Sequence, residues 1–138
     1  MPFDAKQLAG PAVVRLSLAN PETVPAGRYA KIWLEARNTW NDVAARVLPA
    51  IDVRAALSAV ESGGAEAGIV YRTDALRTKR VHVIFEVPLA EGPAIVYPHA
   101  ALRAARDERL ARKLIEFLDG PAARAAFERH GFALPLAH

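Results

Sequence analysis

The sequence predicts an α/β fold with a mainly parallel sheet that is flanked by helices. The first observation behind this prediction is an alternation along the chain. Short segments rich in β-branched and other apolar residues are followed by segments whose apolar residues recur at helical spacing. Strands that alternate with helices favour parallel pairing, because each helix carries the chain back to the start of the next strand. The second observation is size and composition, since 138 residues with 52% apolar and 24% charged residues are enough to bury one core.

Residues 12–18 form the first predicted strand, an apolar run that lies between a Gly-Pro pair and an Asn-Pro pair. A loop with two prolines follows, and the helical spacing of apolar residues then predicts a helix over residues 27–37. A second, short helix is predicted over residues 41–47, with Thr39 or Asn41 as its N-terminal cap.

The middle of the chain predicts a helix, a strand and a turn. Residues 51–61 are expected to be helical with Asp52 in the N-cap position. The Ser-Gly-Gly run that follows ends this helix, because glycine tolerates the left-handed conformation. Residues 67–71 are expected to form a short buried strand, and Thr73 with Asp74 begins a turn or a short helix.

The last part of the chain predicts two more strands and two helices. Apolar and polar residues alternate over residues 81–87, which predicts a third strand, and residues 94–97 are expected to form a fourth. An amphipathic helix is predicted over residues 107–118. A final helix is predicted over residues 122–130, closed by Gly131.

Composition excludes several classes of function. The net charge of +3 comes from arginines scattered along the chain, whereas nucleic-acid binders concentrate their charge, so we expect no nucleic-acid partner. The chain has no cysteine and its four histidines are far apart, which argues against a bound metal cation. No serine, histidine and carboxylate occur in a recognisable motif, so we predict that the protein is not an enzyme. The sequence contains neither an apolar run long enough to span a membrane nor a signal peptide.

Three features of the sequence could hold a small anion. Residues 24–27, Val-Pro-Ala-Gly, precede a helix whose first backbone N–H groups and dipole favour negative charge. The next helix start, at Asp52 and Val53, offers the same donors if the Asp52 carboxylate points away. Tyr71 ends a strand, and ligands of open α/β sheets bind at the carboxyl ends of strands. Taken alone, each feature is explained more simply as a proline-rich helix start, a plain N-cap or a half-buried tyrosine.

Together with their flanking residues, these features closely resemble the molybdate-binding proteins of bacterial ABC importers. The similar segments are NPETVPAGRYAK at residues 20–31, DVRAAL at 52–57, GIVYRTDA at 68–75 and IVYP at 95–98. Further similarity from residue 117 to residue 132 extends the resemblance over nearly the whole chain. The length of the first segment makes the resemblance far more specific than a short motif.

The resemblance implies a periplasmic-binding-protein type II-like lobe. Residues 1–98 would form the anion-binding lobe, the second lobe of the family, and residues 99–138 a helical segment that completes the first lobe. The implied ligand is molybdate or tungstate, bound as an oxyanion by the N–H of Ala26, the N–H of Val53 and the hydroxyl of Tyr71. No cofactor and no free metal cation is implied. The partner would be the membrane permease of an ABC importer, and the resemblance implies that the protein itself is periplasmic.

The sequence departs from the family in length, because it has no counterpart to the first lobe, to the two serine-bearing loops of that lobe, or to the secretion signal. Two lost hydrogen bonds to a charged group would cost about 3–6 kcal/mol, so we expect the isolated chain to bind molybdate weakly or not at all. A complete gene product without a signal would be cytoplasmic. Exposed apolar residues on the C-terminal helices predict a homo-oligomer. The protein could instead be a truncated remnant that no longer transports, or the ligand-sensing domain of a regulator.

Overall fold

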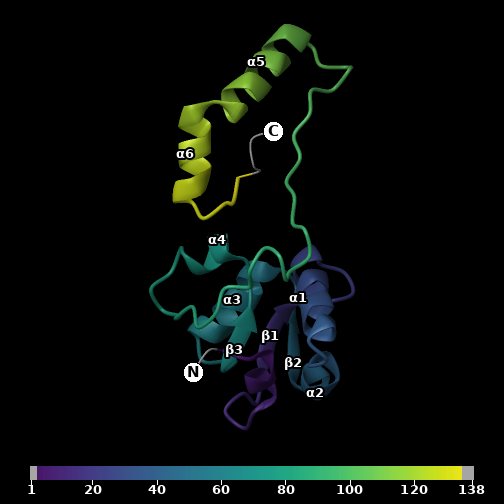
Figure 1. The fold of residues 1–138 in the computed structure, drawn as a ribbon, viewed down its shortest axis with the longest axis vertical. Helices are drawn as coiled ribbons and strands as arrows, with labels where there is room; N and C mark the ends of the chain where they lie inside the picture. The colour runs from purple at the N-terminus through teal and green to yellow at the C-terminus, as the bar shows by residue number, and fades with distance from the viewer. Residues whose placement is uncertain (1–2, 135–138) are drawn as a thin grey trace. The chain divides into compact units, whose positions relative to one another are not determined.

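The computed structural model describes residues 3–134, and the chain divides into two compact units, Met1–Ala94 and Ile95–His138. The helices and strands of the first unit are, in chain order, η1 (Ala5–Ala9), β1 (Leu16–Ala19), α1 (Pro25–Ala36), α2 (Trp40–Val43), η2 (Ala44–Arg46), β2 (Val47–Ala50), α3 (Val53–Glu61), β3 (Ala67–Ile69) and α4 (Arg72–Ala75). The second unit contains α5 (Glu108–Asp119) and α6 (Pro121–Arg129) (Figure 1).

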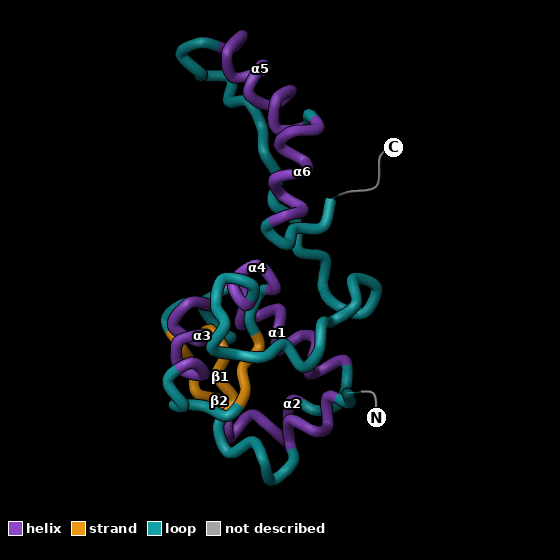
Figure 2. The backbone as a smooth tube through the Cα atoms, turned by 90° about the vertical axis from the view of Figure 1, so that its left-hand side faces the viewer, coloured by secondary structure: helices purple, strands orange, loops and turns teal. Residues whose placement is uncertain are grey.

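The first unit is built on a three-stranded sheet in the order β2-β1-β3, in which both pairs of strands are parallel. Figure 2 draws the strands in orange. The connection from β1 to β2 carries α1 and α2, and the connection from β2 to β3 carries α3 back past β1. Parallel connections are right-handed, so two connections that run in opposite directions place their helices on opposite faces of the sheet. Helices α1 and α3 accordingly lie on either side of β1 (Figure 1). The predicted α/β fold with a parallel sheet is confirmed.

The core lies between β1 and the helices that follow it. All four residues of β1 are fully buried, and Leu16 and Leu18 pack with Trp33 and Leu34 of α1 and with Val43 of α2. The strand predicted at residues 12–18 is therefore confirmed in place, although it begins only at Leu16.

Helix boundaries agree well with the sequence where a local residue sets them. Asp52 is the N-cap of α3, and the chain leaves this helix through Gly63, whose φ of +76° favours glycine. Gly131, with a φ of +88°, has the same role after α6. The short helix predicted over residues 41–47 is instead α2 with Thr39 as its N-cap, followed by the 3-10 turn η2.

Strand β2 was not predicted from the sequence, which placed a helix up to Val47 and assigned nothing to the residues after it. The strand contains Pro49, a residue that weakens a strand prediction because it cannot donate a backbone hydrogen bond. Since β2 is an edge strand, the position of Pro49 needs no donor on its outer side. Register pairs Leu18 with Pro49 and Ala19 with Ala50.

Two predicted strands are wrong. Residues 81–87 and 94–97 are not in strands, and neither segment pairs with the sheet in the described part of the chain. The alternation over residues 81–87 corresponds to burial, because Phe85 and Val87 pack against the core while Ile84 is 68% exposed. A strand needs a neighbour for its backbone N–H and C=O groups, so alternation predicts extended chain and not pairing.

The second unit consists of two helices that pack on each other and on the chain around them. Phe132 contacts Phe127 and Tyr97 edge to face, with ring centroids 5.9 and 5.8 Å apart. The helices predicted at the C-terminus are confirmed as α5 and α6. Along α5, Leu110 and Phe117 are 64% and 61% exposed, so much of its apolar stripe is uncovered within this unit. No helix of residues 3–134 is long and apolar enough to cross a membrane.

Candidate functional site

The three strands of the first unit end side by side. Register places Ala19 of β1 opposite Ala50 of β2, and Leu18 opposite Ile69 of β3. Because the strands are parallel, the chain leaves all three at one edge of the sheet, named here the carboxyl edge. The segments that carry Ala26, Val53 and Tyr71 are the ones that follow β1, β2 and β3. The topology therefore brings the three sequence-predicted positions to the same edge.

Helix α1 begins at this edge without a side-chain cap. Its N-cap is Val24, which offers no acceptor, and its first residue is Pro25, which has no N–H. The first helical bond runs from the N–H of Arg28 to the carbonyl of Val24. Among the described residues no acceptor is recorded for the N–H groups of Ala26 and Gly27, so these two donors remain for an outside partner.

Gly27 lets α1 approach the end of β1 very closely. A Cβ added to Gly27 would lie 1.9 Å from the carbonyl oxygen of Ala19 and 2.7 Å from the carbonyl carbon of Asn20. Only a residue without a Cβ fits there, because both contacts are with backbone. Gly27 is thus required for the position of the α1 start at the carboxyl edge.

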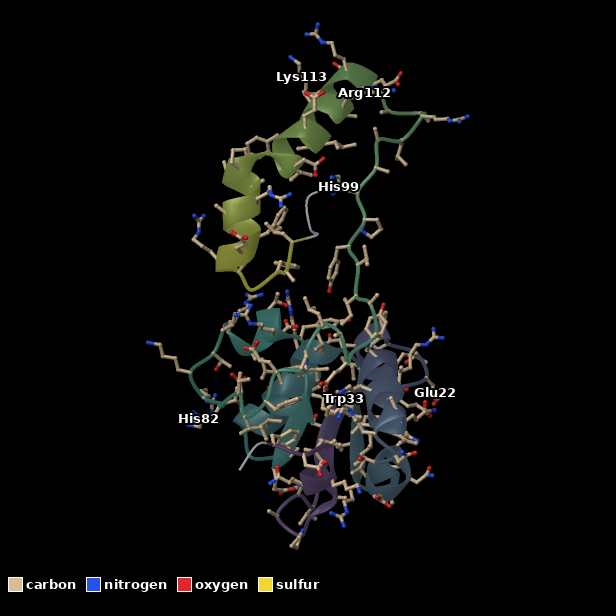
Figure 3. The ribbon with its side chains drawn as sticks, viewed as in Figure 1. Glu22, Trp33, His82, His99, Arg112 and Lys113 are labelled. Atoms are coloured by element: carbon tan, nitrogen blue, oxygen red, sulfur yellow. The ribbon has the colours of Figure 1, made fainter. Side chains whose placement is uncertain are left out.

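The loop between β1 and α1 is held by local polar contacts. The Asn20 carboxamide oxygen accepts the N–H of Glu22 at 2.9 Å, and the Lys31 ammonium pairs with the Glu22 carboxylate at 2.9 Å. Figure 3 labels Glu22. The hydrogen bond between the Lys31 ammonium and the Glu22 carboxylate, together with their opposite charges, lowers the pKa of Glu22 and raises the pKa of Lys31. Lys31 also lies 5.3 Å from the ring centroid of Trp40. The sequence analysis did not predict this network, since Glu22, Lys31 and Trp40 are nine residues apart along the chain and no local motif links them.

Helix α3 begins with a different arrangement. The Asp52 carboxylate accepts the N–H of Ala55 at 2.8 Å, and the carbonyl of Asp52 accepts the N–H of Ala56 at 3.1 Å. No acceptor among the described residues is recorded for the N–H groups of Val53 and Arg54. The carboxylate is occupied by its own helix, which leaves the Val53 donor available at the carboxyl edge.

Tyr71 follows β3 and is the N-cap of α4. Its side chain is half-buried, and its carbonyl accepts the N–H groups of Asp74 and Ala75 at 3.0 and 3.1 Å. These two bonds fix the backbone of Tyr71 at the point where the chain turns from strand to helix.

Two small cavities of the first unit are lined by residues other than these three. One lies between α3 and α4, and the other lies beside α1. Neither is lined by Ala26, Val53 or Tyr71. Across residues 3–134, no three histidine, aspartate or glutamate side chains gather as metal ligands. What the carboxyl edge can contribute chemically is hydrogen-bond donation from uncharged groups, the N–H groups at the starts of α1 and α3.

Comparisons with known proteins cover nearly the whole chain. Residues 2–133 match a family described as bacterial extracellular solute-binding protein. Molybdate-binding protein ModA of Escherichia coli (strain K12) is 37% identical over 87% of this chain and 46% of its own length. YvgL of Bacillus subtilis (strain 168), assigned as an ABC transporter substrate-binding lipoprotein, is 36% identical over 86% of this chain and 45% of its own length. The chain thus spans less than half the length of these relatives.

A solved structure gives the same result for the fold. The substrate-binding domain assigned to a molybdenum ABC transporter of Clostridium difficile has a TM-score of 0.85 and 28% identity to this chain. The similarity covers 96% of this chain and 58% of that one. The predicted likeness to periplasmic binding proteins is therefore confirmed at the level of the fold.

Proposed function

Because the chain belongs to the family of bacterial extracellular solute-binding proteins, we propose that it forms one wall of an oxyanion site and takes molybdate or tungstate as ligand. The observation that carries this proposal is the meeting of two helix starts with unpartnered N–H groups at one edge of a parallel sheet. In this proposal the donors are the N–H of Ala26, the N–H of Val53 and the hydroxyl of Tyr71.

Uncharged donors suit a fully ionised tetrahedral dianion. Backbone N–H groups at a helix start carry a partial positive charge, which the anion neutralises without any lysine or arginine. A backbone N–H cannot accept a hydrogen bond from a ligand O–H, so these donors favour molybdate over an anion that is partly protonated at neutral pH. The negative charge of the Asp52 carboxylate repels a bound anion. Its exposure to solvent and its hydrogen bond from the Ala55 N–H reduce this repulsion.

The affinity of this wall alone is limited. Each hydrogen bond to a charged group contributes about 1.5–3 kcal/mol, but an open edge leaves water competing for every donor. We propose that full affinity requires a second wall, supplied by the remaining part of a solute-binding protein. A cleft closed on both sides would exclude that water and strengthen each contact.

The second unit fits the same scheme. We propose that residues 99–138 complete the lobe that carries the second wall, which would cover the exposed stripe of α5. A second copy of this chain is the alternative cover, and light scattering distinguishes the two because only the latter gives a dimer of the purified chain. The whole assembly would deliver its anion to a membrane permease outside the cytoplasm and carry out no catalytic step.

Thermal unfolding with millimolar molybdate, tungstate, sulfate or phosphate tests the ligand. A ligand that binds only the folded chain raises its stability, by about 2.7 kcal/mol at 100 times its Kd. We expect molybdate and tungstate to raise the Tm of the unaltered chain. The rise should be smaller in the Tyr71→Phe variant, and in the matched control Tyr97→Phe it should equal that of the unaltered chain. Equal responses to all four anions, or a larger response to sulfate and phosphate than to molybdate and tungstate, would overturn the proposal.

A further inference from the structure

The cavity between α3 and α4 is lined mainly by charged side chains, and we name it the charged cavity. It measures about 170 Å³, and its lining residues are Arg54, Leu57, Glu61, Asp74, Arg77 and Thr78. The first three recur at helical spacing along α3, so they lie on one face of that helix. The other three belong to α4 and to the turn that follows it, and α4 packs against α3 (Figure 1). The cavity is thus built entirely by the first unit.

The charged groups of this cavity do not neutralise one another in ion pairs. Within residues 3–134, no salt bridge is recorded for its two arginines or its two carboxylates. The arginines are exposed and the carboxylates are half-buried, so a small molecule in the cavity can reach all four groups. Opposite charges attract most strongly in contact, yet here they stand around a space of molecular size.

Contacts outside the charged groups hold the outer wall of the cavity in place. The N–H of Arg77 donates to the carbonyl of Asp74 at 3.1 Å, which forms the turn after α4. The Arg80 guanidinium donates to the carbonyl of Glu61 at 3.2 Å, and the Arg80 N–H donates to Thr78 Oγ1 at 3.1 Å. These bonds tie the turn to the end of α3. The position of the turn is therefore fixed without the guanidinium and carboxylate groups that line the cavity.

The charges determine the kind of ligand. Two guanidinium groups and two carboxylates leave the cavity without net charge, so an anion would be repelled by the carboxylates and a cation by the guanidinium groups. A zwitterion with one group of each sign has a partner for both. Guanidinium groups bind carboxylates through two parallel hydrogen bonds, and side-chain carboxylates accept hydrogen bonds from an ammonium group. Leu57 adds a single apolar contact, which matches a small apolar group on the ligand.

We propose that the charged cavity binds a small α-amino acid. Its carboxylate pairs with the guanidinium groups of Arg54 and Arg77. Its ammonium group pairs with the carboxylates of Glu61 and Asp74, and its side chain contacts Leu57. Binding does not depend on the proposed oxyanion site, because none of the lining residues is one of the three proposed donors.

L-Alanine, propionate and ethylamine test this proposal, because propionate lacks the ammonium group of alanine and ethylamine lacks its carboxylate. The readout is the backbone N–H signals of Arg77 and Thr78 in a ¹H–¹⁵N spectrum of the 138-residue chain, at constant pH and ionic strength. We expect L-alanine to shift both signals saturably. It should bind about tenfold more tightly than either analogue, since each analogue loses one set of hydrogen bonds between charged groups. The N–H signals at the start of α5 should stay in place and serve as the internal control.

Variants of the turn identify the groups that hold the ligand. Arg77→Gln should weaken the binding of L-alanine about tenfold, as followed through the Thr78 signal. Lys79→Gln is the matched control, because it removes the same charge from an exposed position of the same turn outside the lining, and it should leave the affinity unchanged. The backbone spectra also show whether each variant folds. The proposal would be overturned by the absence of a saturable shift with millimolar L-alanine, by an analogue that binds as tightly as L-alanine, or by equal losses in the two variants.

Discussion

Replacing Gly27 by alanine should destabilise the first unit strongly. The new Cβ would lie 1.9 Å from the carbonyl oxygen of Ala19, whereas carbon atoms in contact with other heavy atoms prefer about 3.5 Å. The obstacle is backbone, so the start of α1 or the end of β1 has to move by more than about 1 Å. Overpacking costs about 1–3 kcal/mol, and a clash with backbone belongs at the upper end of that range. The better helix propensity of alanine returns at most about 1 kcal/mol, so we expect a net loss of about 2–3 kcal/mol.

Urea unfolding followed by circular dichroism measures this loss as a lower midpoint at an unchanged slope. Gly64→Ala is the matched control, because a Cβ at Gly64 would lie 3.1 Å from its nearest neighbour, the carbonyl oxygen of Ala59. A shift of a few tenths of an ångström relieves that contact, so the control should lose less than about 1 kcal/mol. Equal midpoints for the two variants would refute the close approach of α1 to β1, and with it the position of the Ala26 donor.

Three further changes test other contacts of the first unit. Ser17→Ala removes a fully buried hydroxyl that has no partner within residues 3–134, so the urea midpoint should stay or rise, and a loss above about 1 kcal/mol would contradict this. Asp52→Ala removes the cap on the Ala55 N–H and should cost about 1 kcal/mol by the same assay, whereas an unchanged midpoint would show that the cap is not formed. Lys31 lowers the pKa of Glu22, so the stability that this pair contributes is present at neutral pH and is lost as the pH falls through that lowered pKa. The drop in midpoint on acidification should therefore be smaller in Glu22→Gln, and an identical drop would exclude a contribution from the pair.

The sequence predicts those parts of the fold that local chemistry determines. Asp52 places the start of α3 because a carboxylate three residues before an N–H caps it, and Gly63 ends the helix because the backbone there needs a positive φ. The start of α1 was predicted two residues too late, at residue 27, because Pro25 was assigned to the loop although proline also fits the first residue of a helix. These signals involve residues at most four positions apart, so a single sequence contains them.

Strand pairing depends on residues far apart, and there the sequence was insufficient. Val47 pairs with Leu16, which lies thirty-one positions earlier in the chain, and no residue within β2 indicates that partner. Residues 81–87 carry a clear alternation yet pair with no described strand. The positions of Ala26, Val53 and Tyr71 could be predicted one by one, but their meeting at one edge follows from the strand order β2-β1-β3, which is a property of the fold. Their role as donors stays a prediction.

The most direct test of the oxyanion site is a titration of the ¹⁵N-labelled chain with molybdate, followed through its backbone N–H signals. Four helices of eight or more residues begin in the described part of the chain, and α5 and α6 belong to the second unit, where neither follows a strand of the sheet. The proposal predicts that the N–H signals of Ala26 and Val53 shift with molybdate while those at the start of α5 stay in place, and that sulfate has a smaller effect. Shifts of equal size at all helix starts, or larger shifts at the start of α5 than at Ala26 and Val53, would contradict it.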